Sequence, residues 1–186
     1  MYGLVNRGIE QLVRSRFGDA VWDEVCRAAG FEDDGFIAME SYDDSITYAL
    51  VGAISETCDL DVATILEEFG EHWVVYTAQE GFGDLIAMCG NDVRSFLLNV
   101  NMLHEQVQSG FPALTPPHFE LEESDPDHFT LVYRSERAGL GPMVIGLLRG
   151  IARTLGETIE IEHLPGDETT PDRFTIVRVP SSETTP

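Results

Sequence analysis

The sequence predicts an α+β fold, in which a helical amino-terminal part is followed by an antiparallel sheet with packed helices. Apolar residues recur at spacings of three and four through the first two thirds of the chain, which is typical of amphipathic helices. Beyond residue 117 they alternate with polar residues instead, which is typical of strands. A chain of 186 residues with 43% hydrophobic residues has enough apolar material for one core. We therefore expect a single domain over residues 1–179 and a disordered tail at 180–186, where PSSETTP offers nothing apolar to bury.

The helical part contains several apolar stripes, some with clear start or stop signals. Asp19 precedes the second stripe and Gly30 follows it, while Asp61 is placed to cap the fourth. The predicted helices cover Val5–Phe17, Val21–Ala29, Ile46–Ile54 and Val62–Trp73, with a short helical piece at Asp84–Met88.

The longest stripe follows the capping pair Asn91–Asp92 and contains His104. Its apolar residues run from Val93 to Val107 at spacings of three and four. The segment FPALTPP ends this helix, because its three prolines lack amide donors and favour extended backbone.

The carboxy-terminal third alternates between strand and helix patterns. Two strands, Phe119–Leu121 and Phe129–Tyr133, are predicted on either side of the turn-like ESDPD. A helix follows from Pro142 to Leu155, and a closing pair of strands is expected at Ile159–Ile161 and Phe174–Val179.

Composition excludes several classes of partner. With 33 acidic and 11 basic side chains, the net charge of -22 repels nucleic acids and anionic membrane surfaces. No apolar run is long enough to cross a bilayer.

The three cysteines, Cys26, Cys58 and Cys89, form no C-x-x-C pair, which favours a reducing, cytoplasmic setting. All the basic residues are arginine, which either a high-salt habitat or a GC-rich genome would explain.

Two features could carry chemistry. His104 is either a core histidine or a ligand, because a lone histidine on an apolar stripe fits both interpretations. Tyr133, Ser135 and Arg137 alternate along a strand, so their donors point to one side and suit a carboxylate. The alternative is a surface strand whose arginine pairs with an acidic side chain.

Separated motifs in the chain resemble the heme nitric-oxide/oxygen-binding (H-NOX) family over residues 1–179. They are MYGLVNRGIEQLV, NVNMLHEQV, LTPP and LVYRSERAGLGPMVIGLL. The chain looks most similar to bacterial stand-alone members of the cyanobacterial type and to the heme domain of the soluble guanylate cyclase β subunit. The resemblance implies that the fold encloses heme b with His104 as the iron ligand. It also implies that Tyr133, Ser135 and Arg137 bind the propionates and that Pro117 presses on the porphyrin. The heme would be noncovalent, since the chain has no C-x-x-C-H string.

The same resemblance places Met143 where oxygen-binding members have a distal tyrosine. A thioether donates no hydrogen bond, so we expect binding of nitric oxide and carbon monoxide and exclusion of oxygen. Trp73 matches a second distal residue, although simple core packing explains it nearly as well. Val5, Ile9 and Val144 are further pocket candidates with the same alternative. Some members of the family carry a zinc site of cysteines and a histidine in their carboxy-terminal half. Every cysteine of this chain precedes residue 90, so we expect no zinc site.

The resemblance implies a sensor rather than an enzyme. Nitric oxide would weaken the iron bond to His104, and the signal would pass in trans to a histidine kinase or a diguanylate cyclase. One alternative is a heme-free protein-interaction domain with His104 in its core. Another is a heme enzyme, which would need a distal acid-base residue that the chain does not offer. The remaining histidines are expected to be exposed: His72, His118, His128 and His163.

Overall fold

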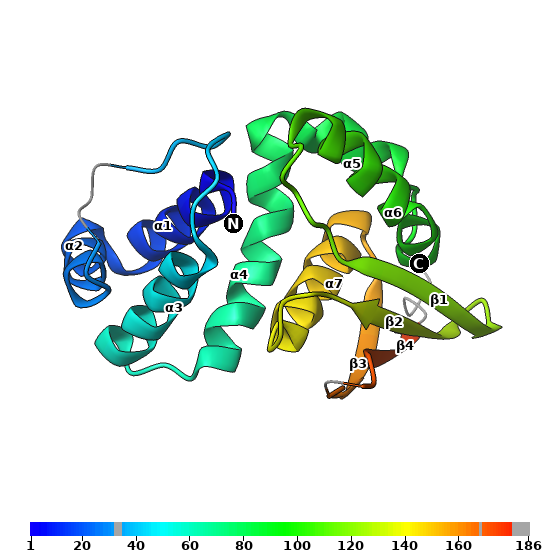
Figure 1. The fold of residues 1–186 in the computed structure, drawn as a ribbon. Helices are drawn as coiled ribbons and strands as arrows, with labels where there is room; N and C mark the ends of the chain where they lie inside the picture. The colour runs from blue at the N-terminus through cyan, green and yellow to red at the C-terminus, as the bar shows by residue number, and fades with distance from the viewer. Residues whose placement is uncertain (32–34, 168, 180–186) are drawn as a thin grey trace, which may run out of the picture.

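A computed structural model describes residues 1–31, 35–167 and 169–179 of the protein. The predicted disordered tail at 180–186 lies outside the described residues. The described chain is helical up to residue 110 and then forms a four-stranded antiparallel sheet with one further helix (Figure 1). The predicted α+β fold is confirmed.

Three helices form the amino-terminal side of the molecule (Figure 1): α1 (Gly3–Phe17), α2 (Asp19–Ala28) and α3 (Asp44–Cys58). Their apolar faces meet around Trp22 and Leu50, both fully buried. Asp43 caps α3 by accepting a hydrogen bond from the amide of Ser45, at 2.8 Å.

Helix α4 (Val62–Thr77) runs through the middle of the molecule and packs closely against α7 (Gly141–Leu155). The two backbones approach closely where Gly70 faces α7 and Gly146 faces α4, because a Cβ atom at either position would collide with the backbone of the other helix. After α4 comes a π-helical turn, η1 (Ala78–Phe82), where Gly81 has a φ of 101° that favours glycine. This turn leads into the short helix α5 (Gly83–Met88) and was not predicted from the sequence.

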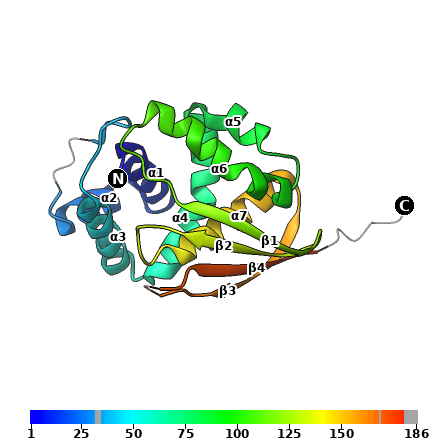
Figure 2. The ribbon, with the colours of Figure 1, turned by 45° about the vertical axis from the view of Figure 1, so that its right-hand side comes forward.

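Helix α6 (Val93–Gly110) carries His104. Asp92 caps it, as predicted, by accepting a hydrogen bond from the amide of Ser95 at 2.8 Å. The sheet has the order β1-β2-β4-β3, so β1 and β3 form its edges. Its strands are β1 (His118–Asp125), β2 (His128–Arg134), β3 (Thr158–Leu164) and β4 (Asp172–Val179). In Figure 2, α6 and α7 lie beside the sheet, with α1–α3 beyond α4.

The buried apolar residues form two separate clusters. One lies between the sheet, α6 and α7 and includes Phe129, Leu131 and Phe174. The other lies among α1–α4 and includes Trp22 and Leu50. Helix α4 contributes to both. Within the described residues, no helix combines the length and apolarity needed to cross a membrane.

Candidate functional site

A cavity of about 500 Å³ lies between the two apolar clusters. Its volume falls in the range of about 300–1,000 Å³ that is common for ligand and cofactor pockets. All the site residues predicted from the sequence line it, although they come from five different segments of the chain: Trp73, His104, Pro117, Tyr133, Ser135, Arg137 and Met143. The further candidates Val5, Ile9 and Val144 line it as well.

His104 reaches the cavity from α6, and its Nδ1 atom is buried without a hydrogen-bond partner. Burial lowers the pKa of the imidazole, and the nearby carbonyl of Pro117 only partly opposes this shift. The side chain is therefore neutral at pH 7. A neutral imidazole in an apolar wall could serve as a ligand for a metal held in the cavity.

Tyr133 is the last buried residue of β2, and only 5% of the surface of this residue is exposed. Burial raises the pKa of its phenol, while the hydroxyl of Ser135 beside it opposes the shift. The strand ends at Arg134, so Ser135 and Arg137 lie in the loop that leads to α7 rather than on the strand itself. The Ser135 hydroxyl holds this loop by accepting a hydrogen bond from the backbone N–H of Arg137 at 3.1 Å.

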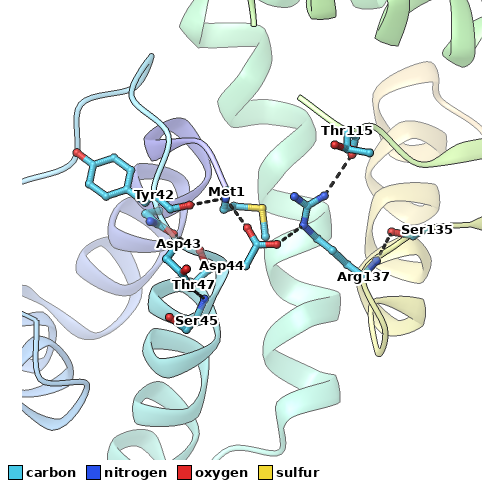
Figure 3. Close-up of polar contacts among 10 residues, drawn as sticks. Met1, Tyr42, Asp43, Asp44, Ser45, Thr47, Thr115, Ser135 and Arg137 are labelled. Carbon is cyan, nitrogen blue, oxygen red and sulfur yellow. Dashed lines mark hydrogen bonds and ion pairs between the residues drawn. The ribbon is translucent and has the colours of Figure 1, made fainter. Parts of the chain in front are cut away.

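Arg137 links the two sides of the cavity mouth (Figure 3). Its Nε donates to Asp44 Oδ2 on α3 at 2.8 Å, and its Nη1 donates to the carbonyl of Thr115 at 3.2 Å. The amino group of Met1 also donates to Asp44, and this bond and then Arg137 lower the pKa of the Asp44 carboxyl, against the effect of burial. Within the described residues these bonds leave Nη2 of Arg137 for a further carboxylate. The arginine therefore pairs with an acidic side chain, as the alternative interpretation foresaw, and lines the cavity at the same time.

Another part of the cavity wall lies where α4 meets α7. Met143 packs here, and Trp73 lies between Phe69 and Tyr76, with ring centroids 5.6 and 5.8 Å from theirs. Trp73 thus takes part in core packing and also lines the cavity, while its role as a distal residue stays a prediction. Its indole N–H is a possible hydrogen-bond donor in the cavity lining, to which Met143 also belongs.

The donor set fits heme. Most of the lining is apolar and would contact a flat macrocycle, with an uncharged imidazole on one wall. A phenol, a hydroxyl and a guanidinium in the lining would receive its carboxylates. A group with one hydrophobic body and two acidic arms matches this arrangement.

Comparison with known families decides the assignment. Residues 2–163 match the family model described as Haem-NO-binding. The chain belongs to this family. The H-NOX resemblance seen in the sequence is therefore confirmed, while the assignment to its cyanobacterial type stays a prediction.

Relatives and solved structures of H-NOX proteins agree with this assignment. Soluble guanylate cyclases gcy-31 and gcy-37 of Caenorhabditis elegans are 28% and 30% identical over 169 and 160 residues, which cover 88% and 84% of this chain. The chain spans only 24% and 23% of those two proteins. A crystal structure of an H-NOX protein from S. oneidensis in the Fe(II)NO ligation state superposes with a TM-score of 0.87 at 20% identity, covering 97% of this chain and all of that one. An unliganded Fe(II) H-NOX protein from K. algicida also gives 0.87, at 22% identity over the full length of both chains. These structures share the H-NOX fold.

The other histidines only partly follow the sequence prediction. His118 and His128 are exposed, but His72 has its Nε2 buried, and His163 is half-buried with its Nε2 2.7 Å from Asp172 Oδ1. The prediction of exposure was therefore wrong for both His72 and His163. No group of three or more histidine, cysteine or acidic side chains suited to a metal ion occurs in the described part of the chain.

Proposed function

We propose that residues 1–179 form a heme-based gas sensor that binds nitric oxide and carbon monoxide and excludes oxygen. The observation that carries the proposal is the convergence of His104, Arg137 and Met143 on one apolar cavity in a Haem-NO-binding chain. His104 would hold the iron of ferrous heme b, which would supply a coordination position for a diatomic gas.

The chain's own residues hold and orient the heme. His104 is kept neutral by burial and so is available as a ligand without first losing a proton. Arg137 supplies the cation for the propionates in a chain of net charge -22, and Tyr133 and Ser135 donate to the remaining carboxylate oxygens. Pro117 lies in the cavity wall immediately before β1 and would press on the porphyrin.

The proposed gas selectivity rests on Met143 and Trp73 in the cavity lining. Bound oxygen develops negative charge and needs a hydrogen-bond donor, which Met143 does not provide. The indole N–H of Trp73, which also lines the cavity, is a possible donor, so exclusion of oxygen requires that this group does not bond to the gas. Oxygen exclusion therefore tests both residues.

The signal would leave through contacts with a separate protein. Loss of the bond to His104 would free α6 to move relative to the sheet, and a partner that prefers one position of α6 would detect the change. A histidine kinase or a diguanylate cyclase in trans, in the cytoplasm, is the proposed recipient.

Absorption spectroscopy tests the proposal directly. The purified chain is reconstituted with hemin, reduced, and recorded alone and with oxygen, carbon monoxide or nitric oxide. We expect a Soret band that shifts with carbon monoxide and nitric oxide and stays unchanged in air apart from slow oxidation. A protein without a Soret band would instead support the heme-free interaction domain, and a stable oxygen complex would refute the selectivity.

A further inference from the structure

Asn101 joins the helix of His104 to the edge of the sheet. It lies on α6, three residues before His104, and its amide makes two hydrogen bonds with the backbone of Phe119 on β1. Its Nδ2 donates to the Phe119 carbonyl at 2.6 Å, and the Phe119 N–H donates to its Oδ1 at 3.1 Å.

These two bonds complete the pairing of an edge strand. In an antiparallel ladder, the N–H and C=O of one residue point either both toward the neighbouring strand or both away from it. Phe119 is registered with Tyr133 of β2, and its backbone groups point away from β2, toward Asn101. The side chain of Asn101 thus takes the place of a further strand at this position.

Phe119 in turn contacts the groups that define the site. Its ring centroid lies 5.9 Å from that of His104 and 5.3 Å from that of Tyr133. It also follows Pro117, whose carbonyl lies near the imidazole, by two residues. Any sliding of α6 along β1 would therefore change the position of His104 relative to both Phe119 and Pro117.

We propose that Asn101 is a positioning residue that fixes the imidazole of His104 relative to the heme plane. The role depends on the proposed function, since it concerns His104 as an iron ligand. Asn101 does not line the cavity and would act through the backbone of Phe119.

The test compares two asparagines of the same helix. Asn101→Leu removes both bonds at nearly constant volume and leaves the Phe119 N–H and C=O without partners. Asn99→Leu is the matched control, because Asn99 also makes two bonds, from Nδ2 to the carbonyls of Cys89 and Ser95, both at 2.9 Å and neither to β1.

Two measurements are made on each variant. In the heme-free protein, amide hydrogen exchange at Phe119 should accelerate at least tenfold in Asn101→Leu and stay unchanged in Asn99→Leu. In the ferrous heme-loaded protein, the iron–imidazole stretching band in the resonance Raman spectrum should shift and broaden only in Asn101→Leu. Asn101→Asp keeps the acceptor for the Phe119 N–H, so it should retain most of that protection and show a smaller Raman shift.

The outcomes separate this role from the proposed function. An unchanged Raman band in Asn101→Leu, with faster exchange at Phe119, would overturn the positioning role while leaving the sensor intact. Equal Raman shifts in Asn99→Leu and Asn101→Leu would also overturn it, since they would reflect general loosening of α6. If Asn101→Leu does not fold, an unchanged iron–imidazole Raman band in Asn101→Asp would likewise overturn the positioning role. A wild-type chain that binds no heme would refute the proposed function itself.

Discussion

The close contact of α4 with α7 predicts a large cost for adding one methyl group. In Gly146→Ala, the new Cβ would lie 2.7 Å from the carbonyl carbon of Glu67 and closer still to its oxygen. Overpacking in a core usually costs about 1–3 kcal/mol. Because the obstructing atoms are backbone and cannot rotate away, we expect about 3 kcal/mol, which is a substantial part of the roughly 5–15 kcal/mol that stabilises a domain.

Urea unfolding of the heme-free protein, followed by circular dichroism, measures this cost. With a slope of about 1–3 kcal/mol per molar urea, the midpoint of Gly146→Ala should fall by at least about 1 M. Gly52→Ala is the control, because Gly52 lies in α3 with no heavy atom within 4 Å of the added Cβ. It should gain about 0.5–1 kcal/mol from the better helix propensity of alanine. A wild-type midpoint for Gly146→Ala would show that the helices do not approach as described.

Further predictions concern the cavity. His104→Gly should lose heme and regain it when imidazole is added, as monitored by the Soret band. Met143→Tyr should form a stable oxygen complex in air, which the wild-type chain should not. Arg137→Leu should weaken heme binding about tenfold or more, since a charge-assisted hydrogen bond contributes about 1.5–3 kcal/mol, whereas Tyr133→Phe and Ser135→Ala should each cost less in a hemin titration. Because burial lowers the pKa of His104 below its usual 6.5, the unfolded chain takes up more protons in acid. The heme-free protein should therefore lose stability as the pH falls below about 6.5, and a His104→Leu variant should lose less.

The helices and strands could be predicted from the sequence because their patterns are local. The stripe from Val93 to Val107 determines which side of α6 is buried, and the alternation of Phe129, Leu131 and Tyr133 determines the inner face of β2. The cavity residues were found through family motifs, since periodicity alone could not distinguish a ligand at His104 from a core histidine.

The polar contacts between distant segments could not be predicted. Arg137 and Asp44 are 93 residues apart, and nothing in either local sequence indicates which of the many acidic residues is the partner. Asn101 and Phe119 pair across the proline segment, where no periodicity continues. His72 was wrongly expected to be exposed, because it lies one position off the apolar stripe of α4, yet its Nε2 is buried.

The position of the cavity between two apolar clusters has a consequence for how the protein unfolds. The buried residues of one cluster, such as Leu131 and Leu148, belong to the sheet side, and those of the other, such as Ile9 and Leu66, belong to the amino-terminal helices. A heme touching both clusters binds only when both are folded, so its binding free energy couples them. We expect the heme-loaded protein to melt at a higher temperature and over a narrower range than the heme-free protein, because bound heme stabilises both clusters together. In cells short of heme, proteases would first degrade heme-free molecules in which one of the two clusters has unfolded.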